Sequence, residues 1–308
     1  MKSVAKGVYP TMITPFTADN EVDLDAVERI TKWYQQADCE GIFAVCQSSE
    51  MFFLSLEEKI AIARRVIQTV RDSGKPTCVV CSGHTSDTLE DQARELIAMH
   101  ECGAAAVVWV SNRLDINNEG DDVWIANAEK LLSMLPADMV LGIYECPYPY
   151  KRLLTPRILE WCKQVGRFAF IKDTCCDPQM LSDRLEQLKD SDIGLFNANS
   201  QTLLYTMQRG GAGFSGILAN TCPDLFVWLC RHWEDHPDEA RRLQELITVC
   251  SFSCYPYPVS AKYTMNLAGL DFDLHTRSAD KNAFTAYNRM CIDDMYFLTQ
   301  RAKAALSE

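Results

Sequence analysis

Short runs of apolar and β-branched residues recur along most of the chain, and amphipathic helical patterns separate them. Such runs predict buried strands, because β-branched and aromatic side chains pack well on a pleated surface. Strands that alternate with helices predict a parallel sheet, and eight such units are typical of a closed (β/α)8 barrel. The eight predicted strands are Val8–Thr14, Gly41–Cys46, Thr77–Cys81, Ala104–Val110, Met139–Tyr144, Phe168–Lys172, Ile193–Asn197 and Gly213–Ala219.

Helix start signals support this alternation. Ser55 and Glu58 have the spacing of a capping box, in which each side chain bonds the backbone N–H of the other residue. Thr155-Pro156 and Asp177-Pro178 each place a capping residue before a proline at the first helical position. We therefore expect α/β architecture, with a (β/α)8 barrel in residues 1–222. The remaining residues, 223–308, predict a C-terminal helical extension packed on the barrel.

Composition and charge exclude several classes of partner. The chain has 308 residues, of which 47% are hydrophobic and 23% charged, as expected of a globular protein. Its formal net charge of −12 provides no basic surface for nucleic acid or an anionic membrane. The residues that follow Met1 form no apolar segment of signal-peptide length, and the longest apolar run, Ala104–Val110, is too short to cross a bilayer. We expect a cytoplasmic protein.

The cysteines and histidines do not predict a metal site. The chain contains 14 cysteines, which we expect to be reduced thiols in a chain without an export signal. Cys78 and Cys81 lie three apart in a predicted strand, where they face opposite sides of the sheet and cannot chelate one metal. His232 and His236 are four apart, but Pro237 follows and the sequence between them is not a metalloprotease motif, so a surface helix end is favoured.

Lys172 is the strongest candidate for a catalytic residue. It closes the apolar run Phe168–Ile171 and precedes Asp173 and Thr174. An ammonium on an apolar strand is poorly solvated, which lowers its pKa and favours the neutral amine. The neutral amine is the form that condenses with a carbonyl to make a Schiff base. Taken alone, the local sequence favours a lysine that extends past the strand end to water.

Polar residues at other strand ends favour the catalytic interpretation. Active sites of (β/α)8 barrels lie at the carboxyl ends of the strands. Tyr144 closes the predicted strand before that of Lys172, and neighbouring strands lie about 4.8 Å apart, so both side chains can reach one ligand. The second predicted strand ends in Cys46-Gln47-Ser48-Ser49-Glu50, which offers amide and hydroxyl donors to a carboxylate.

Several motifs, in order, resemble the dihydrodipicolinate synthase/N-acetylneuraminate lyase family of class I aldolases. The resemblance covers residues 7 to 270. Its motifs are Gly7-Val8-Tyr9-Pro10-Thr11-Met12-Ile13-Thr14-Pro15-Phe16, Leu54-Ser55-Leu56-Glu57-Glu58-Lys59, Tyr144-Glu145-Cys146-Pro147, Ile171-Lys172-Asp173, and Gly210-Gly211-Ala212-Gly213 with Asn220 beyond it.

The resemblance implies a (β/α)8 barrel that binds pyruvate or another 2-oxo acid as a covalent lysine imine, with no separate cofactor. Lys172 matches the Schiff-base lysine and Tyr144 the tyrosine that relays protons. The resemblance also implies a homo-oligomer, a tetramer or a dimer. Substrate-binding residues are expected in the loop after the second strand, after the seventh strand and in the eighth strand: Gln47, Ser48, Ser49, Asn199, Ser200, Ser215 and Gly216.

Three departures from the family pattern bear on the substrate. The carboxylate-binding loop of the family reads Gly-Thr-Thr-Gly-Glu or Gly-Ser-Thr-Gly-Glu, and here it is Cys46-Gln47-Ser48-Ser49-Glu50. Ser111-Asn112-Arg113 stands where dihydrodipicolinate synthases carry Pro-Tyr-Tyr, whose second tyrosine reaches a neighbouring subunit. Pro149 stands where they carry the arginine that grips the carboxylate of the aldehyde substrate, although Lys151 and Arg152 are close in sequence.

The sequence therefore predicts a Schiff-base-dependent lyase, either an aldolase or a dehydratase, that acts on pyruvate or a hydroxylated 2-oxo acid through Lys172. Substrate hydroxyls are expected to meet Asn199, Ser200 or residues 145–152. Two alternatives remain open. One is a synthase-like condensation of pyruvate with an aldehyde, and the other is a barrel that binds 2-oxo acids without catalysis. A metal-dependent hydrolase is disfavoured, because no histidine–carboxylate cluster falls at the predicted strand ends.

Overall fold

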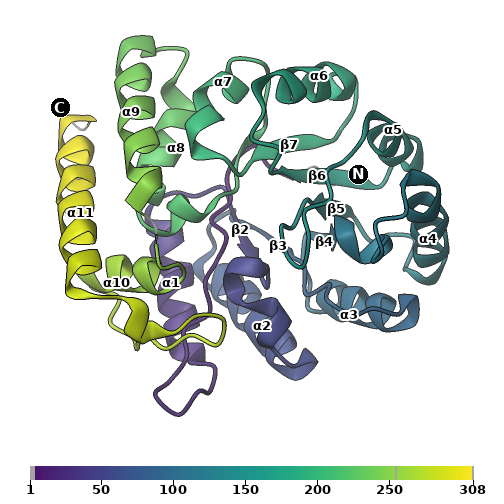
Figure 1. Cartoon of the computed structure of the whole chain (residues 1–308), viewed down its shortest axis with the longest axis horizontal. Helices are drawn as coiled ribbons and strands as arrows, with labels where there is room; N and C mark the ends of the chain where they lie inside the picture. Colours follow the sequence, from purple (N-terminus) through teal and green to yellow (C-terminus); the bar gives the residue numbers. More distant parts are fainter. Residues whose placement is uncertain (1–3, 254, 307–308) are drawn as a thin grey trace.

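The computed structural model describes residues 4–253 and 255–306. Eight parallel strands form one sheet in the order β1-β8-β7-β6-β5-β4-β3-β2, and a bridge between Thr11 and Phe43 joins the two ends. The sheet is thus a nearly closed barrel ringed by helices (Figure 1), which confirms the predicted fold class. The strands are β1 (Gly7–Val8), β2 (Gly41–Ala44), β3 (Cys78–Cys81), β4 (Ala106–Val110), β5 (Leu141–Tyr144), β6 (Phe168–Asp173), β7 (Gly194–Asn197) and β8 (Gly213–Phe214).

The first and last strands are shorter than the sequence predicted. The chain leaves β1 before Pro10, whose nitrogen carries no hydrogen to donate to a neighbouring strand. After β8, the segment predicted to continue as a strand forms a 3-10 helix, η5 (Ile217–Asn220). The Ile-Leu-Ala sequence is apolar throughout, and a short apolar run does not by itself distinguish a buried strand from a buried helical turn.

Helices follow the strands as expected of the barrel. Ser55 caps its helix through the predicted capping box with Glu58, and the side chains of Thr155 and Asp177 cap the next two predicted starts. The helices are α1 (Leu24–Gln36), α2 (Leu56–Ser73), α3 (Leu89–Glu101), α4 (Asp121–Met134), α5 (Pro156–Val165), α6 (Pro178–Leu188), α7 (Leu203–Met207), α8 (Pro223–His232), α9 (Pro237–Cys250), α10 (Val259–Leu267) and α11 (Ala286–Leu306).

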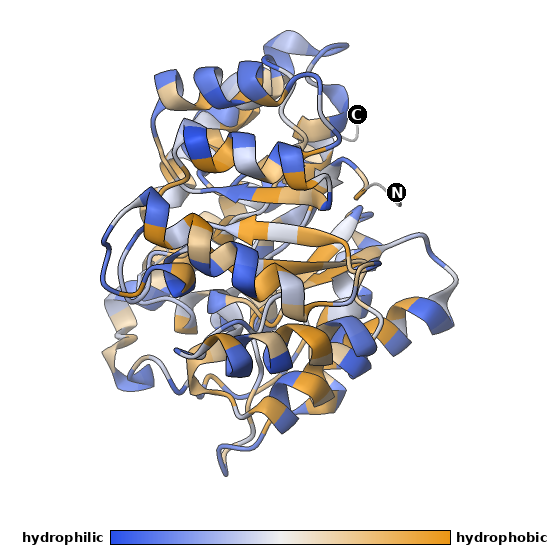
Figure 2. Ribbon diagram, turned by 90° about the vertical axis from the view of Figure 1, so that its right-hand side faces the viewer, coloured by the Kyte–Doolittle hydropathy of each residue, from blue (hydrophilic) through white to orange (hydrophobic). Residues whose placement is uncertain are grey.

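Aromatic side chains fill the interior of the barrel. The rings of Phe170 and Phe196 stack at 4.4 Å, and Tyr9 meets Phe196 edge-on at 4.9 Å. Phe43 contacts Phe170 at 5.8 Å and Tyr144 at 6.0 Å, so it lies between this aromatic layer and the carboxyl ends of the strands. The hydropathy colouring of Figure 2 shows the strands as mainly apolar and the helices as two-faced, which is the pattern of a filled barrel core.

The C-terminal helices cover one side of the barrel. Phe226 of α8 stacks on Phe214 of β8 at 4.1 Å between ring centroids, and α11 lies at the edge of the molecule beside α9 and α10 (Figure 1). A second, smaller apolar cluster joins these helices and includes Val259, Ile292 and Met295. In the part of the chain that the structure describes, no helix is both long enough and apolar enough to span a membrane.

Candidate active site

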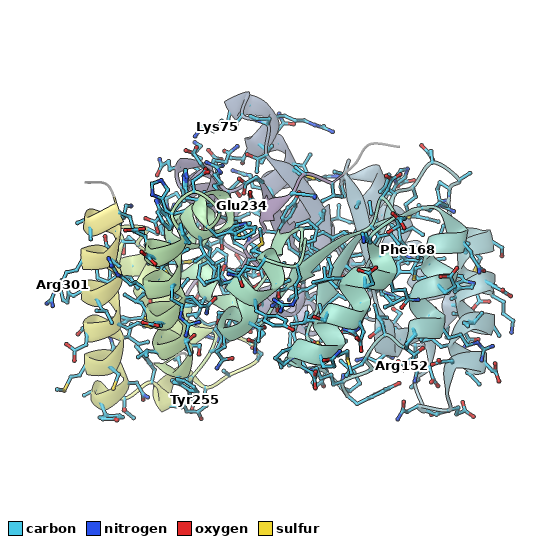
Figure 3. The ribbon with its side chains drawn as sticks, turned by 90° about the horizontal axis from the view of Figure 1, so that it is seen from above. Lys75, Arg152, Phe168, Glu234, Tyr255 and Arg301 are labelled. Carbon is cyan, nitrogen blue, oxygen red and sulfur yellow. The ribbon has the colours of Figure 1, made fainter. Side chains whose placement is uncertain are left out.

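A cavity of about 390 Å³ opens among the loops that follow β2, β5 and β8, at the carboxyl ends of the strands. Side chains mark the two ends of the barrel in Figure 3: Lys75, just before β3, lies on the opposite side of the molecule from Arg152, which follows β5. The residues that line the cavity are Gln47, Ser48, Glu50, Phe52, Phe53, Tyr144, Pro147, Tyr148, Lys172, Ile217, Tyr257, Pro258 and Ser278.

A larger, open depression of about 890 Å³ lies elsewhere, between helices α1, α2 and α3. Its lining includes charged side chains that already pair with one another, among them Arg65 with Glu28 at 2.9 Å. We place the candidate site in the smaller cavity, because convergent polar groups with perturbed pKa values distinguish an active site better than size does.

Lys172 and Tyr144 are paired neighbours on β6 and β5, so both side chains enter this cavity. The Lys172 Nζ lies 4.0 Å from the centre of the Tyr144 ring and 5.6 Å from that of Phe43. The ammonium has no carboxylate partner and no hydrogen bond among the described residues, and only 4% of the side chain is exposed. Burial lowers the pKa of Lys172 to about 8, although the nearby Cys46 and Cys146 thiols oppose the shift.

The Tyr144 hydroxyl donates a hydrogen bond to the Gln47 Oε1 at 3.2 Å, and the Cys146 thiol donates to the same oxygen at 3.0 Å. Burial, with a further contribution from Cys146, raises the pKa of Tyr144 well above its ordinary value. The phenol is therefore protonated and can act as an acid. Both donors bind the Gln47 side-chain oxygen, so the side-chain nitrogen remains available to a ligand. This nitrogen has no hydrogen-bond partner within the described chain.

The two predicted serines of the loop after β2 have different surroundings. Ser48 lines the cavity and donates to the Thr11 hydroxyl at 3.1 Å. Ser49 is turned away: its hydroxyl donates to the Met12 carbonyl at 2.6 Å and accepts from the Cys46 N–H at 3.0 Å. Ser49 therefore holds the loop against the segment after β1, and it does not line the cavity.

Glu50 ties the C-terminal part of the chain to this loop. Its Oε2 accepts hydrogen bonds from the backbone N–H groups of Arg277 and Ser278, at 2.7 and 2.6 Å. The buried Lys262 Nζ lies 3.8 Å from the other carboxylate oxygen. Glu50 thus holds the wall of the cavity in place through Oε2, while Oε1 is buried without a hydrogen-bond partner among the described residues.

The other predicted substrate-binding residues lie outside the cavity. The Asn199 side chain caps the following turn, accepting from the Thr202 N–H at 3.1 Å and donating to Gln201 at 2.9 Å. Ser200 begins the same turn and is buried. Ser215 and Gly216 follow β8: the Ser215 hydroxyl is buried without a hydrogen-bond partner among the described residues, and Gly216 lies close against the Ala198 carbonyl.

Tyr257 is a cavity residue that the sequence did not reveal. Its hydroxyl accepts a hydrogen bond from the Asn220 side chain at 3.1 Å, and it also bonds with Ser48 and Thr11. Asn220 is in turn fixed by the Tyr34 hydroxyl at 2.5 Å. Burial raises the pKa of Tyr257, and these hydrogen bonds oppose the rise. Tyr257 stands between two prolines in a segment without a recognisable motif, and only the folded chain brings it opposite Ser48.

The cationic residues near Pro149 do not enter the cavity. Arg152 pairs with Asp115 at 2.8 Å and with Asp121 at 3.0 Å and is 7% exposed. Lys151 is exposed and is not part of the cavity lining. Lys172 is therefore the only cationic side chain that lines the cavity within the described chain.

Ser111-Asn112-Arg113 also has a structural role. The Asn112 side chain donates to the backbone carbonyls of Cys146, Tyr148 and Tyr150, at 3.0, 2.9 and 2.6 Å. Arg113 forms an ion pair with Asp87. The segment thus fixes the loop that follows β5, which carries two of the cavity residues, Pro147 and Tyr148. Among residues 4–253 and 255–306, no group of three or more histidine, cysteine or carboxylate side chains is arranged to hold a metal ion.

Comparisons with known proteins agree on one family. The model of the dihydrodipicolinate synthetase family matches residues 4–280. A 4-hydroxy-tetrahydrodipicolinate synthase of Staphylococcus epidermidis is 23% identical over 262 residues, which are 84% of this chain and 86% of that protein. A catalytic-lysine mutant of the sialic acid aldolase of Ruminococcus gnavus superposes with a TM-score of 0.86 at 14% identity, covering 97% of both chains.

The prophage protein YagE of E. coli K12, solved in complex with pyruvate, superposes with a TM-score of 0.82 at 19% identity, covering 97% of this chain and 98% of YagE. The structural likenesses, at these low identities, establish the shared barrel. The family model spans most of the chain and agrees with the order of motifs along the sequence. The chain belongs to the dihydrodipicolinate synthetase family.

Proposed function

We propose that this protein is a class I aldolase-type enzyme that binds pyruvate or another 2-oxo acid as an imine of Lys172. One observation carries the proposal: a buried amine without a counter-ion, its pKa lowered to about 8, lines a cavity beside a tyrosine hydroxyl. A lysine that served only stability would be expected to have hydrogen-bond acceptors around it, because an unpaired buried ammonium is costly.

The reaction begins when the neutral Lys172 amine attacks the carbonyl carbon of the 2-oxo acid. The carbonyl oxygen leaves as water and a protonated imine forms. The positive imine nitrogen then withdraws the electron pair that a neighbouring carbon–hydrogen or carbon–carbon bond releases, and an enamine results. Tyr144 is positioned to donate and recover protons at the reacting oxygen, because its hydroxyl is protonated and its ring contacts the Lys172 amine. No metal or organic cofactor is required.

The carboxylate of the 2-oxo acid would lie against the part of the cavity wall that Gln47, Ser48 and Tyr257 form. The Gln47 side-chain nitrogen has no other partner among the described residues, and the Ser48 and Tyr257 hydroxyls would each exchange a present hydrogen bond for one to the carboxylate. These two hydroxyls belong to one buried network with Thr11 and Asn220, so their positions are fixed before the ligand binds. Hydrogen bonds to an ionised acceptor are stronger than neutral ones, which makes this wall suitable for a carboxylate. Cys46 and Ser49, which stand at the two glycine positions of the family loop, bond to each other behind this wall.

The sequence favoured a hydroxylated substrate whose hydroxyls met Asn199, Ser200 or residues 145–152. Asn199 and Ser200 lie outside the cavity, and only Pro147 and Tyr148 of residues 145–152 line it, so the proposal rests on the 2-oxo acid alone. Condensation with an aldehyde that carries a carboxylate, as in the relatives named as synthases, is disfavoured because the cavity offers no second cation. A barrel that bound 2-oxo acids without catalysis would not need the neutral amine beside Tyr144.

The test is borohydride reduction in the presence of pyruvate, read by intact mass. We expect one reduced adduct on the wild-type protein, located at Lys172 by peptide mapping, and none on Lys172→Ala. Lys151→Ala, which removes an exposed lysine near the mouth of the cavity, is the matched control and should retain the adduct. An adduct that persists on Lys172→Ala would place the nucleophile elsewhere, and no adduct with any 2-oxo acid would refute the proposal.

A further inference from the structure

The mouth of the cavity is built from apolar side chains. Phe52 of the loop after β2 meets Tyr148 of the loop after β5 edge-on, with 4.9 Å between the ring centroids. Phe53, Tyr148 and Ile217 are 48%, 49% and 38% exposed. Three partly exposed apolar side chains from three different loops thus surround one opening. Contiguous exposed apolar surface of this kind marks a place where something binds.

The same region lacks fixed charge that could recognise a polar reactant. Lys172 lies deep in the cavity, and in the proposed function its amine forms the imine with the 2-oxo acid. The single carboxylate in the lining, Glu50, carries a negative charge that would repel an anionic reactant, and one of its oxygens is occupied by the N–H groups of Arg277 and Ser278. Two guanidiniums lie near the cavity: that of Arg152 is held by Asp115 and Asp121, and that of Arg277, which also donates to the Phe53 carbonyl, is paired with Glu58. A charged second reactant would lose its water here without gaining a partner.

The mouth is also held in shape. The Phe53 carbonyl accepts a hydrogen bond from the Arg277 side chain at 2.9 Å, and Arg277 is itself paired with Glu58 at 2.7 Å. On the other side, the Asn112 amide holds the Tyr148 carbonyl at 2.9 Å. The backbones that carry these two aromatic residues are thus fixed by side chains from distant parts of the chain, so the apolar surface is preformed.

The cavity is larger than the 2-oxo acid requires. Allowing a generous 30 Å³ or so for each non-hydrogen atom, about the volume of a water molecule in the liquid, pyruvate fills less than half of the 390 Å³. The remaining space lies between Lys172 and the mouth. Any reactant that forms a carbon–carbon bond to the Lys172-bound acid must occupy it, because the bond is made at the carbon next to the imine.

We propose that the partner which condenses with the lysine-bound 2-oxo acid, or is released from it, is an uncharged aromatic or bulky apolar aldehyde held by Phe52, Phe53, Tyr148 and Ile217. This inference rests on the proposed function, since it assigns the second half of the same site. Edge-to-face contacts with Phe52 and Tyr148 suit a planar ring, and Phe53 and Ile217 cover its apolar edge.

The chemistry is balanced without a further reagent. A water molecule accepts a proton from the methyl carbon of the pyruvate imine, and the resulting enamine carbon attacks the aldehyde carbonyl; that proton later returns to Tyr144 and restores its hydroxyl. The new carbon–carbon bond forms as the carbonyl electron pair moves to oxygen, which takes a proton from Tyr144. Water then hydrolyses the imine, returning the Lys172 amine and releasing a 4-hydroxy-2-oxo acid. The reverse sequence cleaves the same product to pyruvate and the aldehyde.

The first experiment compares aldehydes as acceptors for pyruvate with the wild-type enzyme. We expect kcat/KM for benzaldehyde to exceed those for glyceraldehyde and aspartate semialdehyde by about tenfold or more, within the range that apolar pockets discriminate. A higher kcat/KM for either polar aldehyde would overturn the inference and leave the Lys172 imine standing. A pyruvate adduct without condensation to any aldehyde would also overturn the inference and leave the Lys172 imine standing. Absence of the adduct would instead refute the proposed function.

The second experiment tests the residues. Phe53→Ser and Tyr148→Ser should each lower kcat/KM for benzaldehyde by about tenfold and leave the rate of pyruvate adduct formation unchanged. Phe297→Ser on α11, an equally exposed phenylalanine at 56%, is the matched control and should alter neither rate. Sedimentation of each variant accompanies the kinetics. If Phe53→Ser changes the oligomeric state but not kcat/KM, the apolar mouth contacts a second copy of the chain and the inference is wrong.

Discussion

Lys172 and Lys59 are both almost fully buried, but their surroundings differ completely. Lys59, on α2, donates to the Gly83 carbonyl, the Thr85 hydroxyl and the Glu95 carboxylate, at 3.1, 2.5 and 2.8 Å. Lys172, on β6, has aromatic faces beside it and neither a carboxylate nor a hydrogen-bond acceptor among the described residues. Hydrogen bonds and an ion pair therefore compensate the Lys59 ammonium for its loss of water, and the Lys172 ammonium has no such compensation.

This difference separates a structural lysine from the one that we propose to be reactive. Burial alone raises the pKa of Glu95, but the Lys59 charge and the hydrogen bonds from Thr85 outweigh it and hold the pKa of Glu95 below its usual value. At Lys172, burial is opposed only by thiols, and its pKa falls to about 8. The surroundings of the amine, and not its depth, therefore indicate which lysine can form an imine.

Lys262 lies between these two cases. It is fully buried and its pKa is also lowered to about 8 by burial, with Glu50 opposing the shift. It donates to the His275 carbonyl and lies 4.8 Å from the centre of the Phe16 ring. Lys262 does not line the cavity, however, so a 2-oxo acid bound there does not meet it. A lowered pKa becomes chemically useful only where the amine also faces a site.

The largest effect, a loss of stability, should follow from breaking the buried ion pair between Lys59 and Glu95. Lys59→Met leaves the Glu95 carboxylate buried without its cation, and we expect a loss of about 3–5 kcal/mol in the free energy of unfolding. Urea denaturation measures it. Lys32→Met, which breaks an exposed pair with Glu28, is the control and should leave the free energy of unfolding nearly unchanged. The folded fraction of Lys59→Met should still form the pyruvate adduct; if it does not, Lys59 has a role in the chemistry.

Tyr144→Phe should give the next largest effect. The variant keeps the ring against the Lys172 amine and loses only the hydroxyl that donates to Gln47. We expect turnover to fall by about 10²-fold, the scale of general acid–base catalysis, with the thermal unfolding midpoint nearly unchanged. Steady-state kinetics on any accepted substrate measures the fall. Turnover within a factor of two of wild type would assign Tyr144 to packing alone.

The pH dependence of imine formation sharpens the comparison further. Only the neutral amine reacts, so the rate should rise about tenfold per pH unit below the pKa of Lys172 and level off above about pH 8. Quenching the pyruvate reaction with borohydride at a series of times, from about pH 6 to pH 10, gives this rate. An ordinary lysine would continue to gain rate towards its pKa of 10.5. A profile without a break near pH 8 would mean that the amine is not desolvated as described.

The smallest effect concerns stability. The pKa of Lys172 is lower in the folded chain than in the unfolded one, so the charged amine lowers the free energy of unfolding. This destabilisation is fully present below about pH 8. Lys172→Met removes this cost, and we expect the thermal unfolding midpoint to rise by roughly 2–4 °C near neutral pH, as for about 1 kcal/mol in a large domain. The gain should shrink as the pH rises from about 8 towards 10.5, because the wild-type amine then loses its charge. A lower midpoint for Lys172→Met would show that the amine contributes to stability.

The sequence alone determined the barrel and the positions of the two residues that we propose to be reactive. Eight apolar runs separated by helical patterns predicted the order of the elements, and all eight strands are present. Lys172 and Tyr144 were placed at neighbouring strand ends, and the structure pairs them directly. These inferences succeeded because strand periodicity and strand order are local or topological properties, which the fold repeats at each unit.

Tertiary structure decided which polar residues line the cavity. Gln47, Ser48 and Ser49 are consecutive, but only Gln47 and Ser48 line the cavity. The Ser49 hydroxyl instead donates a hydrogen bond to the Met12 carbonyl. Tyr257 and Ser278 reach the cavity from the C-terminal part of the chain, about 200 residues after the loop they meet. Hydrogen bonds between segments so distant in sequence depend on how the whole chain packs, and no local pattern of residues records them.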